Sequence, residues 1–71
     1  MAVKTEVLFV VEESAEGGYI ASGVGVDIVT EADTLAQLRD NVREAVECHF
    51  DDAQPPRLMR LHFVRDEVLA V

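Results

Sequence analysis

Gly17-Gly18-Tyr19-Ile20-Ala21-Ser22 joins two strand-like runs, and eleven residues after Ser22 the chain reaches Asp33-Thr34-Leu35-Ala36-Gln37-Leu38. Glycines supply the positive φ angles that a tight reversal needs. The second stretch carries a helix-start signal. This order predicts a β-hairpin, then a further strand, then a capped helix.

The runs around the glycine pair predict three strands. Residues 3–12 are rich in β-branched and aromatic side chains and contain no helix-start signal. They are predicted to form a strand that is central in its sheet and covered on both faces in its middle. Residues 19–22 begin the return strand. Gly23-Val24-Gly25 interrupts it, so residues 26–30 are expected to form a third short strand.

Thr34 and Gln37 fit the capping box that opens many helices. In that motif the Thr hydroxyl accepts from the amide three residues on, and the Gln side chain reaches back to the amide of the cap residue. Consecutive prolines in Asp51-Asp52-Ala53-Gln54-Pro55-Pro56 are expected to end the helix. The apolar stripe predicted to pack on the sheet comprises Leu35, Leu38, Val42, Ala45, Val46 and His49.

Beyond the prolines, residues 58–64 alternate in part and predict a half-buried strand. The side chains expected on one face are Met59, Leu61 and Phe63, and those on the other are Arg60 and His62. After an interruption at Arg65-Asp66-Glu67, residues 68–71 are expected either to form a short fifth strand or to cross to another subunit.

These segments predict an α+β fold over residues 1–71, which we interpret as a single domain. It is expected to be an antiparallel β-sheet with one helix packed on one face, in the order β-β-β-α-β. A chain of 71 residues with 49% apolar content is too apolar for disorder. The stability that its small core provides is nevertheless marginal, and small domains often need disulfides, a metal or self-association as well. One cysteine excludes an intrachain disulfide, so we expect self-association into a homodimer or larger oligomer.

Fourteen acidic residues against six basic ones give a net charge of −8. This charge repels nucleic-acid backbones and anionic lipid surfaces, so direct nucleic-acid binding and membrane binding are not expected. It would speed encounter with a basic protein. A lone Cys48 and the absence of an apolar leader at the first residues predict a cytoplasmic protein.

Candidate chemistry is sparse, and we predict no catalytic residue, no cofactor and no metal. The residues considered as metal ligands are His49 and His62, with Cys48 and Asp51 nearby. Cys48 and His49 are adjacent on the helix, so they lack the spacing of paired zinc ligands. Adjacent helical residues do not face each other, so Cys48 is predicted to be a buried structural thiol instead of a nucleophile activated by His49. The carboxylates interpreted as a solvated acidic rim are Glu12, Glu13, Glu16, Asp27, Glu31 and Asp33.

Residues 5–50 resemble the HicB-like antitoxin family. The resemblance is carried by Val10-Val11-Glu12-Glu13, Glu16-Gly17-Gly18-Tyr19-Ile20-Ala21-Ser22, Glu31-Ala32-Asp33-Thr34-Leu35 and Asn41-Val42-Arg43-Glu44-Ala45-Val46. It implies a β-β-β-α-β domain that binds and blocks a small basic toxin of the HicA type, a protein that cleaves mRNA.

The chain departs from that family in two ways. Gly23-Val24-Gly25-Val26-Asp27 stands where family members usually carry a segment ending in Pro-Gly-Cys. Fuller family members continue into a DNA-binding domain, whereas the given sequence ends at Val71, so we expect a short, stand-alone member, and DNA binding is not implied. Three functions are therefore weighed: an antitoxin-type module, a homo-oligomer of structural or regulatory role without a toxin, and an enzyme acting on RNA or a metabolite.

Overall fold

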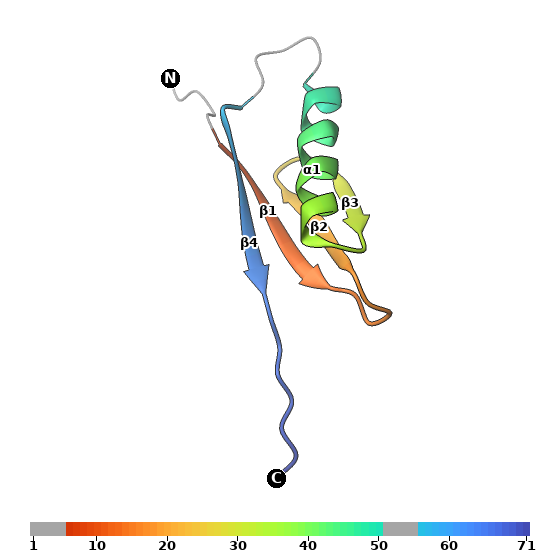
Figure 1. Cartoon of the computed structure of the whole chain (residues 1–71). Coiled ribbons are helices and arrows are strands. Elements are labelled where there is room, and N and C mark those ends of the chain that lie inside the picture. Colours follow the sequence, from red (N-terminus) through yellow and green to blue (C-terminus); the bar gives the residue numbers. More distant parts are fainter. Residues whose placement is uncertain (1–5, 51–55) are drawn as a thin grey trace.

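A computed structural model of the protein describes residues 6–50 and 56–71. One helix packs on one face of a four-stranded sheet whose strand order is β3-β2-β1-β4 (Figure 1). The elements are β1 (Glu6–Glu13), β2 (Tyr19–Val24), β3 (Val29–Ala32), α1 (Leu35–His49) and β4 (Leu58–Val64). The predicted α+β class and the order β-β-β-α-β are confirmed, as is the central position of β1.

The sheet is mixed, which corrects the expectation of a wholly antiparallel one. β1 pairs antiparallel with β2, and β2 pairs antiparallel with β3, but β4 pairs parallel with β1. The reason is the helix between β3 and β4. A helical crossover returns the chain to the end of the sheet where β3 began, so the next strand runs in the same direction as β3 and β1.

The core lies between α1 and the face of the sheet that the helix covers. Every second residue of β1 points into it, and Val7, Phe9 and Val11 are all essentially inaccessible. From the helix, Leu38, Val42 and Val46 fill the same layer at the spacing of the predicted stripe. Leu35 and Ala45 pack at its margin. His49 was predicted on this stripe but is exposed, and its ring meets Phe50 edge to face.

The opposite face of the sheet is not covered by any element within residues 6–50 and 56–71. There, Leu8 and Val10 of β1 remain half-buried. The expectation that the middle of β1 is covered on both faces is therefore wrong. Its continuous apolar run is explained by its central position, where strands on either side shield part of each side chain.

The boundary between the second and third strands also differs from the prediction. Gly23 still pairs with Phe9 across the ladder, and its amide donates to the carbonyl oxygen of Ile28 at 2.8 Å. The interruption falls later, at Gly25, where φ is +79°. β3 therefore begins at Val29, three residues beyond the predicted start.

In addition to the parallel ladder, an ion pair between Arg60 and Glu6 links β4 to β1 on the uncovered face. The guanidinium Nε and Nη2 donate to the two carboxylate oxygens, the second at 3.3 Å. This hydrogen bond lowers the pKa of the Glu6 carboxyl below its usual value. The two-face pattern predicted for this strand is confirmed, because Met59 and Leu61 pack against the core while Arg60 and His62 are exposed.

Residues 65–71 continue away from the end of β4 and leave the body of the molecule (Figure 1). They form no strand in the single chain, so the fifth-strand alternative is wrong for the monomer. The helix ends at His49 with Phe50 as its C-cap. The expected stop at residues 51–56 lies outside the described residues except for Pro56. In the described part of the chain, no helix is long and apolar enough to cross a membrane.

Candidate functional site

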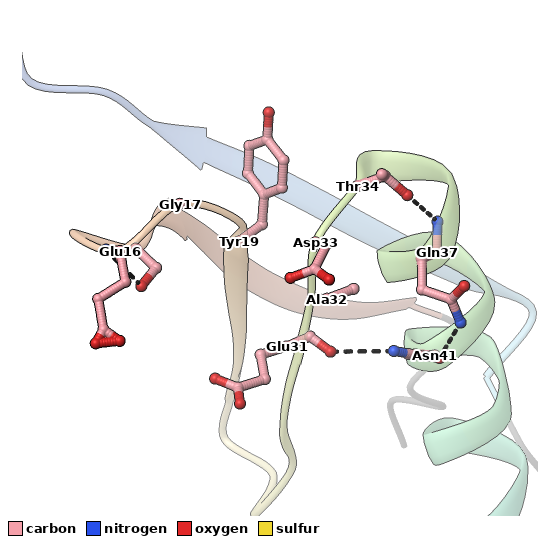
Figure 2. Close-up of a pocket in the computed structure, with 10 residues that line it drawn as sticks. Glu16, Gly17, Tyr19, Glu31, Ala32, Asp33, Thr34, Gln37 and Asn41 are labelled. Atoms are coloured by element: carbon pink, nitrogen blue, oxygen red, sulfur yellow. Dashed lines mark hydrogen bonds between the residues drawn. The ribbon is translucent and has the colours of Figure 1, made fainter.

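A hollow with a volume of about 750 Å³ lies at one end of the sheet. The β1–β2 turn, the end of β3 and the first turns of α1 surround it (Figure 2). Its lining comprises Ser14, Glu16, Gly17, Tyr19, Glu31, Ala32, Asp33, Thr34, Gln37 and Asn41. Most of these residues belong to the sequence motifs that decide the fold.

The glycine pair shapes one wall. The amide of Gly17 donates to the carbonyl oxygen of Ser14, and the Ser14 amide donates to the carbonyl of Gly18, both at 3.0 Å. The predicted positive φ angles are confirmed, at +94° for Gly17 and +84° for Gly18. A Cβ on Gly18 would lie 2.8 Å from the carbonyl oxygen of Ala32, whereas one on Gly17 would meet nothing within 4 Å. Gly18 therefore lets the turn approach the end of β3 closely.

The start of α1 shapes the opposite wall. Thr34 has extended backbone geometry, and its Oγ1 accepts from the amide of Gln37 at 3.1 Å, as the capping box predicts. The return half of the box is not formed. Instead Gln37 Nε2 donates to Asn41 Oδ1 at 3.1 Å, and Asn41 Nδ2 donates to the carbonyl oxygen of Glu31 at 3.0 Å (Figure 2).

This hydrogen-bonded chain explains why the prediction for Gln37 fails. Residues four apart on a helix are neighbours, and Asn41 offers Gln37 an acceptor there. The same chain fastens α1 to β3 at the mouth of the hollow. Sequence reasoning missed this role of Asn41, although the i, i+4 spacing of Gln37 and Asn41 was a signal for half of it.

The charge of the hollow is uniformly negative. Its lining includes three carboxylates, Glu16, Glu31 and Asp33, all on exposed residues, and no Lys, Arg or His. Figure 2 shows Glu16 on the turn, Asp33 in the connection before α1, and Glu31 on β3 with its carboxylate pointing away from α1. Such an arrangement attracts cations or basic side chains and repels phosphate.

The predicted acidic rim is only partly assembled. Glu16, Glu31 and Asp33 share the hollow. Glu12 and Glu13 instead line a smaller depression of about 140 Å³, together with the start of the C-terminal segment. Asp27 lies in the loop between β2 and β3. Among the described residues, no three His, Cys, Asp or Glu side chains are grouped so that they could hold a metal ion.

Cys48 is exposed, which corrects the prediction of a buried thiol. The last turn of α1 buries Val46, and Cys48 lies two residues further, about 200° around the helix axis. It therefore points away from the core. His49 is also exposed and His62 faces solvent on β4, so the structure does not bring the three residues into one site.

A UPF0150 protein of Thermotoga maritima is 37% identical to this chain over 71 residues, the full length of both. The chain belongs to the UPF0150 family. Another UPF0150 protein, from Archaeoglobus fulgidus, is 44% identical over 52 residues, which covers 73% of this chain and 77% of the relative. No family model matches the sequence, and no solved structure matches it. The family name states no activity.

Proposed function

We propose that this UPF0150 protein is a non-catalytic, HicB-like module of antitoxin type that binds a small basic toxin partner in the cytoplasm. The observation that carries the proposal is the acidic hollow. It is built largely from the motif residues on which the HicB-like resemblance rests, including Glu16-Gly17, Tyr19 and residues 31–34. Three of the four segments that carry the family resemblance therefore contribute to one surface, and that surface has the charge that a basic partner requires.

The charge composition of the hollow favours a binding role over a catalytic one. Its three acidic lining residues have no basic neighbour in the lining, so the potential around the opening is negative, although the Glu31 carboxylate projects from β3 away from α1. For exposed groups, charge of this kind mainly raises the association rate and gives the complex a steep dependence on salt. The rim also carries polar groups that can hydrogen-bond to arginine or lysine side chains, on Thr34, Gln37 and Asn41.

The test is binding to the product of the small basic open reading frame expected beside the gene. The variant Glu16→Gln/Glu31→Gln removes two charges from the hollow, and the control Glu44→Gln/Glu47→Gln removes two from exposed positions on α1. Asp33 is left intact because it precedes the helix cap. We expect affinity to fall about tenfold at low salt for the first variant and much less for the control. A neighbouring protein that fails to co-purify at low salt would refute the proposal.

A second candidate is a homo-oligomer of structural or regulatory role without a toxin. It is favoured by the apolar side chains that β4 and the following segment leave exposed, such as Phe63 and Leu69. A gene neighbourhood without a small basic open reading frame would support this alternative.

A further inference from the structure

β4 is an edge strand with an open side. The strand order leaves its outer edge without a partner within the described chain, so a row of backbone donors and acceptors faces outward over seven residues. Its side chains are also incompletely covered. Phe63, on the face toward α1, is 49% exposed, because α1 packs chiefly over β2 and β3. Leu58 on the other face is exposed as well.

The segment that follows, residues 65–71, is a free strand-like arm. It runs on from β4 beyond the body of the molecule (Figure 1). The whole molecule measures 51 × 25 × 17 Å along its principal axes. Val68 and Leu69 on the arm are 92% and 77% exposed. The arm has as many residues as β4, so one arm is long enough to span the whole open edge of a β4 strand.

We propose that residues 65–71 of one copy pair antiparallel with the outer edge of β4 in a second copy, and that the exchange is reciprocal about a two-fold axis near Val64. Each copy supplies both the edge and the arm, so the contact closes as a dimer. The edge gains backbone hydrogen bonds, and the arm buries apolar side chains that have no contact in the monomer.

This axis fixes which residues face each other. Residues at equal distances from Val64 become opposite partners, and opposite residues of an antiparallel pair lie on the same face. Leu69 then lies opposite Met59, beside the incompletely covered part of the core. Asp66 lies opposite His62 on the other face, the face that carries Arg60. The pairing therefore places Leu69 on the apolar face and Asp66 on the face of His62, while Glu67 falls opposite Leu61 and Val68 opposite Arg60.

Charge favours a second copy over a basic partner at this edge. Three of the six basic residues of the chain, Arg57, Arg60 and Arg65, fall within residues 57–65, and this stretch contains no acidic residue. The strand itself is thus basic, but Arg60 is paired with Glu6 of β1, and Glu12 and Glu13 lie near Arg65, so its charge disfavours a basic protein only weakly. The arm brings Asp66 and Glu67, and it belongs to a chain whose net charge is −8. A second copy of the chain therefore carries acidic residues that complement the basic side chains of this edge.

The oligomeric state tests this proposal directly. Light scattering after size exclusion should give the full chain twice its 7.8 kDa mass, and Leu69→Asp should halve that value. Val29→Asp is the matched control, because Val29 is similarly exposed, at 69%, on the opposite edge strand β3. It should stay dimeric. Circular dichroism should show the helical signal of the parent in both variants, since neither side chain contributes to the core, and Leu69→Asp should lose only the strand signal of the arm.

Crosslinking tests the axis. In a Cys48→Ser background, Val64→Cys would place two thiols opposite each other across the two-fold axis, at a separation that a disulfide can bridge. Oxidation should convert this variant to covalent dimers, while the parent with its own exposed Cys48 should crosslink far less. The proposal is overturned by a full chain that is monomeric at tens of micromolar, by a dimeric Leu69→Asp variant, or by dissociation through Val29→Asp alone.

Discussion

The two glycines of the β1–β2 turn should respond differently to the same substitution. Both have positive φ, so alanine at either position introduces backbone strain of roughly 1–2 kcal/mol. Only at Gly18 does the added Cβ also collide with backbone, 2.8 Å from the carbonyl oxygen of Ala32. That atom cannot rotate away as a side chain would. Overpacking of this kind costs a further 1–3 kcal/mol or so.

The expected result is that Gly18→Ala lowers the free energy of unfolding by about 2–4 kcal/mol, and Gly17→Ala by about 1 kcal/mol, partly offset by a stiffer unfolded chain. For a domain of this size, whose total is roughly 4–10 kcal/mol, the first loss is severe. Thermal melts followed by circular dichroism should separate the two variants by at least about 4 °C.

Chain concentration must be the same in both melts, because self-association would shift the apparent midpoint. Equal destabilisation by the two alanines would refute the reasoning, since it would mean that the approach of the turn to β3 contributes nothing beyond backbone strain. A larger loss for Gly17→Ala would contradict the position of the close contact itself.

Three further perturbations test the core, the helix cap and the ion pair. Leu38→Ala should cost about 2–5 kcal/mol in urea denaturation, because the side chain is completely buried, whereas Leu38→Met should cost less than about 1.5. Thr34→Ala should cost about 1 kcal/mol through the lost bond to the Gln37 amide, and Thr34→Ser should restore it. Glu6→Gln should lower the melting temperature slightly at pH 7. Because Arg60 lowers the pKa of Glu6 in the folded state, that difference should vanish as pH falls through the lowered pKa. A difference that grew in acid would contradict this sign.

Local signals in the sequence predicted the elements that local physics determines. The glycine pair predicted a hairpin because positive φ is a property of single residues, and both angles are positive. Thr34 predicted the helix start because its cap bond spans only three residues. The helical spacing of Leu38, Val42 and Val46 predicted the buried stripe, since the spacing depends only on the helical repeat.

Features that join distant parts of the chain were not predictable in the same way. The parallel pairing of β4 with β1 depends on how α1 crosses the sheet, which no pattern within residues 58–64 encodes. The acidic hollow draws Glu16 from the β1–β2 turn and Glu31 from β3, and the pairing of β2 with β3 brings these two segments together.

The two proposed surfaces lie toward opposite edges of one sheet, and this separation decides how they can coexist. The acidic hollow is beside β3, while the positive open edge is β4. If the hollow of one copy took the arginines of another copy's β4, the contact would be heterologous and would grow into open chains. Reciprocal exchange of the arms instead covers β4 and closes at two copies, leaving both hollows free for a basic partner. The two arrangements can be distinguished by measuring the mass of the purified protein alone. Open chains would give a mass that rises steadily with concentration, whereas the closed dimer would give a mass that stays constant at twice that of the monomer. Leu69→Asp should abolish that constant dimer mass, and Glu16→Gln/Glu31→Gln should leave it unchanged.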